Sequence, residues 1–142
     1  VHHRNITVAT NNMNVANALI ANPGCEILLA GGTLRRSDGG LVGALTTQVI
    51  EQFKVDFAII GTSALDRDGD LLDFDLAEVR VSRAILQQAR QAFLVTDHSK
   101  LGRSAPARIA SLSELDAVIT DQPLPDSLMT ACDGWGTRVV VA

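Results

Sequence analysis

The sequence predicts an α/β protein built on a mostly parallel sheet with helices on both faces. Short runs of β-branched and apolar residues recur along the chain, and segments with helical periodicity separate them. The runs are continuously apolar rather than alternating, which is typical of strands covered on both faces of a parallel sheet. They lie at residues 6–10, 26–30, 55–60, 92–96, 117–120 and 138–141.

The segments between these runs place apolar residues at helical spacing. They cover residues 12–21, 45–53 and 76–89. A proline-punctuated turn at residues 122–126 precedes a short last helix. No repeat, low-complexity tract or linker interrupts the 142 residues, so the sequence predicts one domain spanning residues 1–142.

The composition limits the classes of partner. Sixteen acidic against twelve basic residues give a formal net charge of -4, and the densest basic cluster is Arg35-Arg36. Holding a nucleic-acid backbone takes about six to ten clustered basic groups, so we do not expect this chain itself to bind DNA. No apolar run has the length of a membrane span and no signal peptide is recognised, so we expect a cytoplasmic protein without membrane contact.

The beginning of the chain and its two cysteines carry further expectations. The chain opens on Val1 and reaches a strand-like run almost at once, so we expect a fragment truncated at its N-terminus. A sheet edge left by missing strands exposes unpaired backbone groups, which predicts a homo-oligomer. Cys25 and Cys132 lack metal-binding spacing and are interpreted as reduced, buried thiols.

Ligands of open α/β sheets bind beyond the carboxyl ends of the strands, so the residues that follow each run are candidates. After the first run, Asn11 either caps a helix or donates to a ligand oxygen. After the second run, Gly31 and Gly32 allow close backbone approach, and Arg35 offers a fork for phosphate. A plain mobile loop is the alternative, because the glycine pattern matches neither common nucleotide-binding motif.

After the third run come Gly61 and an acidic stretch. A calcium loop is set aside, because the sixth and twelfth positions are not the required Gly and Glu. Asp66, Asp73 and Glu78 lie next to apolar anchors and a helix start, where carboxylates can face a pocket, although helix-end electrostatics alone also favour a Glu at position 78. Arg83 follows Glu78 by five residues, near it but not on the same helical face.

The sharpest signal follows the fourth run. Lys100 is one of only two lysines, and Asp97, Ser99 and Gly102 flank it, as an anion or sugar-oxygen site requires. His98 is interpreted as a surface or supporting group rather than a base. The usual serine-hydrolase and zinc-protease motifs are absent, and no cofactor or metal is predicted.

Several motifs occur in order along the chain: ILLAGGTLR at residues 27–35, DGGLVG at 38–43, DFAIIG at 56–61, LDFD at 72–75 with EVR at 78–80, and DHSKLGR at 97–103. Together they resemble the effector-sensing domain of DeoR-family transcriptional repressors. The similarity covers nearly the whole chain, from VATN at residues 8–11 to the last run.

The resemblance implies a sensor, not an enzyme, with a fold similar to the ribose-5-phosphate isomerase and CoA-transferase group. Its inducer would be a phosphorylated sugar or glycerol 3-phosphate, and operator DNA would be bound by a winged helix-turn-helix domain not present in this chain. Micromolar sensing needs about 8 kcal/mol, whereas one charge-assisted hydrogen bond gives about 1.5–3 kcal/mol, so several groups must share the ligand. The candidate ligand-binding residues are Asn11, Gly31, Gly32, Arg35, Gly61, Asp66, Asp73, Glu78, Arg83, Asp97 and Lys100.

Two alternatives remain open at this point. The resemblance implies that sugar-phosphate isomerases of that fold carry an acidic pair after the third strand, a catalytic Glu opening the next helix and a Lys in an Asp-x-Ser-Lys turn. Here Asp56, Glu78 and Lys100 match these places, but the second acid of the pair falls on Ile59. Enediol chemistry needs a positioned acid and base, so this loss favours binding over catalysis. The other alternative is an oligomerisation module with a vestigial cleft.

Overall fold

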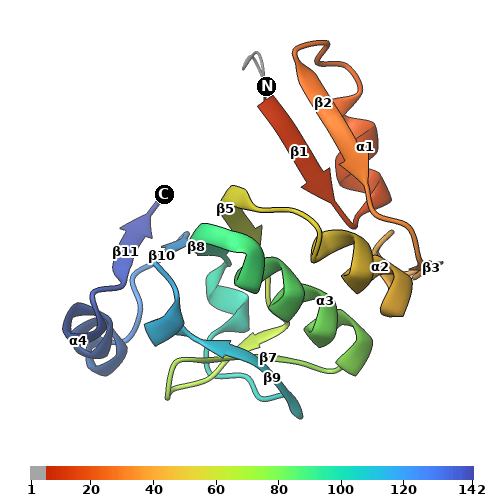
Figure 1. Cartoon of the computed structure of the whole chain (residues 1–142). Coiled ribbons are helices and arrows are strands. Elements are labelled where there is room, and N and C mark those ends of the chain that lie inside the picture. Colours follow the sequence, from red (N-terminus) through yellow and green to blue (C-terminus); the bar gives the residue numbers. More distant parts are fainter. Residues whose placement is uncertain (1–5) are drawn as a thin grey trace. The chain divides into compact units, whose positions relative to one another are not determined.

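The computed structural model describes residues 6–142 and confirms the α/β class. Contacts divide the chain into two compact units, with the boundary between Phe53 and Lys54 (Figure 1). We call them the N-terminal unit and the C-terminal unit and describe each by itself. The expectation of one effector-binding domain over residues 1–142 stays a prediction.

The N-terminal unit is a βαβ element followed by a small hairpin and a helix. Its first two strands are parallel and pair in register from Ile6 with Cys25 to Thr10 with Leu29. Asn12 caps the connecting helix, because its side-chain oxygen accepts hydrogen bonds from the main chain of Asn14 and Val15. The elements are β1 (Ile6–Thr10), α1 (Met13–Leu19), β2 (Cys25–Leu29), β3 (Thr33–Leu34), β4 (Leu41–Val42) and α2 (Ala44–Ile50).

The C-terminal unit is built on a four-stranded parallel sheet in the order β11-β10-β8-β5. These strands correspond to the last four apolar runs of the sequence, with β8 beginning three residues earlier than expected. The elements of this layer are β5 (Val55–Ile60), α3 (Leu76–Gln88), β8 (Ala89–Val95), β10 (Ala117–Thr120), α4 (Asp126–Trp135) and β11 (Arg138–Val141).

A second, antiparallel sheet in this unit was not expected from the sequence. It has the order β6-β7-β9, and two short 3-10 helices accompany it. Its strands are short, and β7 pairs with β9 across more than thirty residues, with a register shift between Leu71 and Leu72. The elements are β6 (Ala64–Leu65), β7 (Asp70–Asp73), η1 (His98–Lys100), β9 (Ala107–Ser111) and η2 (Leu112–Glu114).

The core of the C-terminal unit lies on one face of the parallel sheet. Ala58 and Ile60 of β5 join a buried cluster with Val79 of α3 and Cys132 of α4. In Figure 1 both helices lie below the strands. Helix α3 buries Val79, Val81, Ser82 and Ala84, so its buried residues extend around much of the helix and are not confined to one narrow face.

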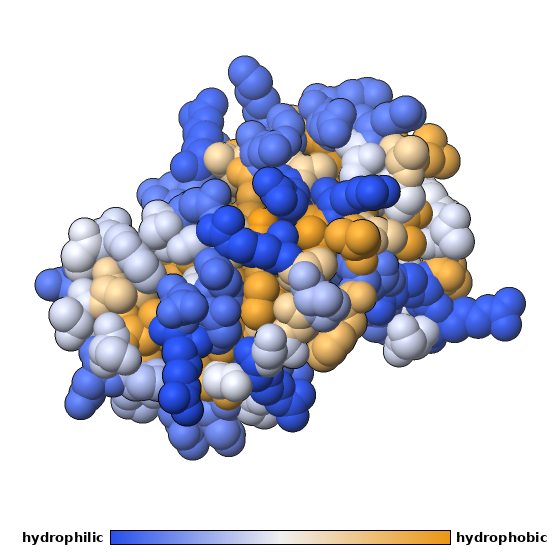
Figure 2. Space-filling view, turned by 90° about the horizontal axis from the view of Figure 1, so that it is seen from below, coloured by the Kyte–Doolittle hydropathy of each residue, from blue (hydrophilic) through white to orange (hydrophobic). Residues whose placement is uncertain are grey.

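The other face of β5 is exposed. Phe57 is 62% exposed and Ile59 69%, and Phe57 stacks on Phe93 of β8 with ring centroids 5.9 Å apart. Continuous apolarity predicted that both faces of this strand are covered, whereas burial along β5 alternates. Figure 2 shows another part of the surface, where apolar side chains (orange) emerge between polar ones (blue).

Candidate functional site

The carboxyl ends of three neighbouring strands meet at one edge of the parallel sheet. Gly61 follows β5, Asp97 and Lys100 follow β8, and Asp121 follows β10. Because β5, β8 and β10 are parallel and adjacent, these residues lie along the edge where ligands of open α/β sheets bind. The structure therefore brings Gly61, Asp97 and Lys100 to one edge, as the sequence predicted.

Asp97 shapes the turn that carries Lys100. Its Oδ1 accepts a hydrogen bond of 2.9 Å from the main-chain N–H of Ser99 and another from the Ser99 hydroxyl. These hydrogen bonds and the nearby Lys100 charge lower the pKa of Asp97, against a smaller opposing contribution from desolvation. The carboxylate is therefore ionised at neutral pH and caps η1.

Lys100 is the cation of this edge. Its main-chain N–H donates to the Asp97 carbonyl oxygen at 3.1 Å, which closes the turn. Its side chain is half-buried, and within residues 6–142 its ammonium has no carboxylate within ion-pairing distance. An ammonium on such a turn that makes no direct ion pair with a carboxylate is suited to meet an anionic ligand.

Asp66 forms the tight turn between β6 and β7. Its Oδ1 accepts hydrogen bonds from the main-chain N–H groups of Asp68 at 3.0 Å and Asp70 at 2.9 Å. The preceding residue, Leu65, accepts the N–H of Gly102 at 2.9 Å, so this hairpin is joined to the exit of the Lys100 turn. Asp66 is thus connected to the Lys100 turn, while one of its carboxylate oxygens already serves the hairpin.

Asp73 and Glu78 flank the beginning of α3. Asp73 is 9% exposed, and its Oδ1 accepts the main-chain N–H of Phe74 at 2.7 Å. Asp75 then caps the helix by accepting the N–H of Ala77 at 2.8 Å. Glu78 lies in the first turn of α3, at the end of the helix remote from the start of β8.

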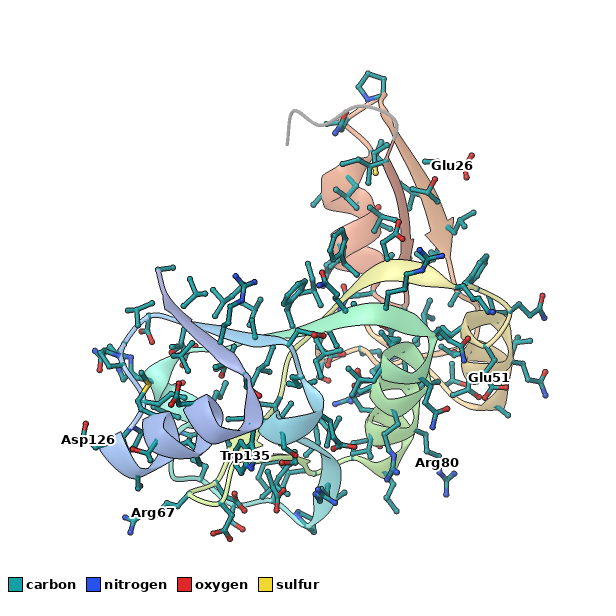
Figure 3. The ribbon with its side chains drawn as sticks, turned by 60° about the vertical axis from the view of Figure 1, so that its left-hand side comes forward. Glu26, Glu51, Arg67, Arg80, Asp126 and Trp135 are labelled. Carbon is teal, nitrogen blue, oxygen red and sulfur yellow. The ribbon has the colours of Figure 1, made fainter. Side chains whose placement is uncertain are left out.

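Arg83 is not brought to Glu78. Five residues turn a helix by about 140°, which separates the two side chains around α3. Figure 3 shows Arg80 pointing away from α3, and Arg83 follows it by three residues on the same side of the helix and is exposed. Arg83 therefore lies on the solvent side of this helix.

The other four predicted residues belong to the N-terminal unit. The Asn11 side-chain amide donates to the Leu41 carbonyl oxygen at 3.0 Å, so it holds the β3-β4 hairpin, while Asn12 does the capping that the sequence left open for this stretch. Arg35 lies in the same hairpin, with its guanidinium 3.7 Å from the Asp38 carboxylate.

Of the two glycines after β2, the fold requires Gly32 but not Gly31. At Gly32 φ is +135°, and an added Cβ would lie 2.0 Å from the Thr46 hydroxyl oxygen and 2.7 Å from the Val42 carbonyl oxygen. The fold itself therefore demands glycine at position 32. Gly31 would make only ordinary contact with Leu45, and its carbonyl oxygen accepts the Thr46 hydroxyl hydrogen bond.

The isomerase match at Asp56 is corrected by the structure. Asp56 is the second residue of β5, near the amino end of the strand, and not a residue that follows it. Its carboxylate is 76% exposed and lies 3.8 Å from Arg90. The acid that catalysis would need at the carboxyl edge is therefore not supplied by Asp56.

Sequence reasoning missed Asp121. It follows β10 directly, and its carboxylate contacts both the main chain and the imidazole of His98, 23 positions earlier. Reading the residue after every strand-like run would have selected it. Within residues 6–142 no group of three or more His, Cys, Asp or Glu residues is arranged to hold a metal ion. In the same stretch, no helix combines the length and the apolarity that crossing a membrane requires.

Comparison with known protein families shows to which family the chain belongs. Residues 1–122 match the family described as DeoR C terminal sensor domain. The chain belongs to this family. The DeoR-family resemblance read from the motifs is thereby confirmed, and so is the expectation of a regulatory rather than an enzymatic chain.

Among its relatives, the DeoR-family chain is 50% identical to the glycerol-3-phosphate regulon repressor of Escherichia coli strain K12 over 129 residues, which is 91% of this chain and 51% of the relative. It is 42% identical to the glycerol-3-phosphate regulon repressor of Haemophilus influenzae over 139 residues, 98% of this chain and 54% of the relative. It is 32% identical to the HTH-type transcriptional repressor CsqR of Escherichia coli K12 over 128 residues, 90% of this chain and 49% of the relative. The chain thus spans about half the length of the curated relatives that it matches.

Proposed function

We propose that this chain is the inducer-binding and oligomerisation domain of a cytoplasmic transcriptional repressor, and that sn-glycerol 3-phosphate is its first candidate inducer. Two relatives named as glycerol-3-phosphate regulon repressors, at 50% and 42% identity, support this choice over other sugar phosphates. In this proposal, operator DNA is bound by a separate helix-turn-helix domain, in keeping with the acidic charge of this chain.

The observation that carries the proposal is the environment of Lys100. Lys100 lies on a turn at the carboxyl edge of the sheet, and within residues 6–142 its ammonium makes no direct ion pair, although Asp97 is near enough to feel its charge. A phosphate monoester offers the charge and the acceptor oxygens that such a group binds. Lys100 is therefore the proposed phosphate ligand.

The rest of the ligand is assigned by the same reasoning. Asp66 lies in the hairpin that is joined to the Lys100 turn, and Glu78 lies in the first turn of α3. The carboxylate oxygens of both residues can accept hydrogen bonds from the hydroxyl groups of a polyol. Gly61 leaves open space where a side chain would stand, because nothing lies within 4 Å of its missing Cβ. The contribution of Asn11, Gly31, Gly32 and Arg35 remains a prediction from the sequence.

Regulation follows from differential affinity. An inducer changes operator binding only to the extent that it binds one state of the repressor more tightly than another. We propose that the inducer-bound state has lower operator affinity, and that the domain forms a homo-oligomer through which the change reaches the DNA. Neither step needs a chemical reaction at the site.

The chain offers a matched pair of variants to test the proposal, because Lys54 and Lys100 are its only lysines. We expect Lys100→Ala to weaken binding of sn-glycerol 3-phosphate about 10- to 100-fold, the equivalent of one lost charge-assisted hydrogen bond of about 1.5–3 kcal/mol. The exposed Lys54→Ala variant removes the same charge elsewhere and should bind as the wild type does. The measurement is titration calorimetry, with ribose 5-phosphate, glycerol and inorganic phosphate as comparison ligands.

Equal affinity in the two variants would refute the role of Lys100. Tighter binding of ribose 5-phosphate would keep the sensor function and replace the inducer. If none of the phosphorylated ligands bound or raised the melting temperature, the inducer-binding function would be wrong and the oligomerisation module would be favoured.

A further inference from the structure

Asp121 reaches across from β10 to the turn that carries Lys100. Its Oδ1 accepts the main-chain N–H of His98 at 2.8 Å, and its Oδ2 lies 2.6 Å from the imidazole Nδ1 of the same residue. The two strands are already paired up to this point, because Thr96 donates its N–H to Ile119 at 3.0 Å. Asp121 thus extends the contact between neighbouring strands by one side chain, directly onto η1.

All three N–H groups of η1 are occupied. His98 donates to Asp121, Ser99 donates to the Asp97 carboxylate at 2.9 Å, and Lys100 donates to the Asp97 carbonyl oxygen at 3.1 Å. A turn whose amides are all engaged cannot cradle a phosphate with its backbone, as glycine-rich anion-binding loops do. An anion that binds at this turn must therefore be met by side chains, of which Lys100 offers the ammonium.

The two carboxylates have different roles in the geometry. Asp97 belongs to the turn and moves with it, so it fixes the shape of η1 but not its position on the sheet. Asp121 belongs to another strand, and it is the carboxylate that fixes where the turn begins relative to β10. The two carboxylate oxygens of Asp121 contact the main chain and the ring of His98. Together they restrain the rotation of the turn and its distance from β10.

We propose that Asp121 is a positioning residue of the inducer site, which acts through His98 to hold the Lys100 ammonium where the phosphate binds. This inference rests on the function proposed above. Asp121 does not touch the ligand in this arrangement, and its negative charge is directed at His98. Neither Lys100 nor Asp97 can position the turn on the sheet, because both lie on the turn itself. The proposal gives this role to the contact between Asp121 and His98.

The pKa of Asp121 agrees with this positioning role. Hydrogen bonding from the His98 side chain, followed by that from its main chain and by its charge, lowers the pKa of Asp121 despite an opposing effect of desolvation. Asp97 is near enough to both Asp121 and Lys100 for their charges to act on it, the former raising its pKa and the latter lowering it. Asp121 therefore remains an anion throughout the neutral range, and its second full acceptor oxygen is lost only when acid protonates the carboxylate, below the pH at which an ordinary Asp titrates.

Asp116 provides a matched control at the opposite edge of the same two strands. It precedes β10, and its Oδ2 accepts the main-chain N–H of Ala92 in β8 at 2.8 Å. Removal of the Asp116 carboxylate breaks one hydrogen bond between the two neighbouring segments, and removal of the Asp121 carboxylate breaks its two contacts with His98. Only Asp121 lies at the carboxyl edge, so a general loss of stability and a specific loss of ligand positioning can be separated.

The experiment compares Asp121→Ala and Asp116→Ala in the purified protein by calorimetric titration with sn-glycerol 3-phosphate, together with the melting temperature of each variant. We expect Asp121→Ala to lower the affinity at least fivefold and Asp116→Ala to leave it within twofold of the wild type, while both lower the melting temperature. Asp121→Asn retains one acceptor oxygen for the His98 N–H, so partial rescue of affinity is expected. Should Asp121→Ala not fold, Asp121→Asn and His98→Ala carry the same comparison.

The possible outcomes separate the two proposals. If the wild type binds the phosphate ester and Lys100→Ala does not, but Asp121→Ala and Asp121→Asn bind as the wild type does, the positioning role is wrong and the proposed function stands. Equal losses of affinity in the Asp121 and Asp116 variants would also overturn it, because they would indicate a stability effect alone. If the wild type binds neither sn-glycerol 3-phosphate nor ribose 5-phosphate, the proposed function fails and this inference fails with it.

A spectroscopic signature provides an independent readout. In an acid titration followed by amide nuclear magnetic resonance, the His98 N–H signal should move with the protonation of Asp121, at a midpoint below the ordinary aspartate range. The Ala92 N–H, which donates to the Asp116 carboxylate, is followed in the same spectra as a second carboxylate-bonded amide for comparison. A His98 signal that is insensitive to acid in the wild type would show that the Asp121 contact is not formed.

Discussion

The two units of this chain are stabilised in different ways. The C-terminal unit has a hydrophobic cluster in which Leu65, Leu71, Leu94, Leu112 and Val118 are fully buried. The described part of the N-terminal unit buries smaller or fewer apolar side chains, namely Ala16, Ala30, Leu41, Val42 and Ile50.

Side-chain to main-chain hydrogen bonds do in the N-terminal unit what apolar packing does in the other. The amides of Asn12 and Asn14 both donate to the Asp38 carbonyl oxygen at 3.1 Å, and Asn11 donates to Leu41. A net hydrogen bond contributes only about 0.5–1.5 kcal/mol, whereas a fully buried leucine contributes about 1.5–3 kcal/mol. The asparagines that follow β1 therefore have a structural role in the N-terminal unit, although their position after a strand also suits ligand donors.

The largest expected effect is a core truncation in the C-terminal unit. Leu94→Ala removes a side chain with no exposed surface and should lower the free energy of unfolding by about 2–5 kcal/mol. Trp135 is the only tryptophan and lies in this unit, so its fluorescence during urea unfolding is the measurement.

Leu41→Ala is the matched change in the N-terminal unit. Leu41 is 7% exposed and has few buried apolar neighbours in the described part of its unit, so the loss should fall at the lower end of that range. Circular dichroism reports both variants. A loss at Leu41 as large as the loss at Leu94 would contradict the difference drawn between the units.

A smaller effect is expected from Gly32→Ala. The added methyl group meets Thr46 and the Val42 carbonyl at a positive φ, so we expect a loss of about 1–3 kcal/mol in the free energy of unfolding, measured by urea titration. Gly43 has a φ of +111° but nothing within 4 Å of the position of a Cβ. Gly43→Ala therefore isolates the backbone strain, and a cost equal to that of Gly32→Ala would show that close packing at Gly32 is unimportant.

The smallest effect concerns the two thiols, one in each unit. Cys132 is fully buried, and desolvation raises its pKa, whereas Cys25 is half-buried. We expect an aromatic disulfide reagent at pH 8 to modify Cys25 readily and Cys132 only after unfolding. Because the folded Cys132 keeps its proton to higher pH than the unfolded thiol, its contribution to stability is present at neutral pH and is lost as the pH rises toward and through the raised pKa. Equal labelling rates would contradict the burial difference.

Part of the candidate site could be predicted from the sequence because its signal is local. A residue that closely follows a strand-length apolar run is expected at the carboxyl edge of a parallel sheet. Lys100 follows such a run and lies at that edge. The same rule could have found Asp121. It could not have shown that Asn11 is used by the Leu41 carbonyl oxygen, 30 residues away, or that Arg83 points away from Glu78 around the helix.

Local patterns in the sequence predicted β1, β2, β5, β8, β10 and β11 and the helices between them, because apolar periodicity acts within a few neighbouring residues. The sequence did not predict that β6, β7 and β9 form a second sheet, that one face of β5 is exposed, or that Asp121 holds His98. These features depend on pairings between residues that are distant in the chain. Local residue preferences do not specify such pairings; the packing of the whole core does.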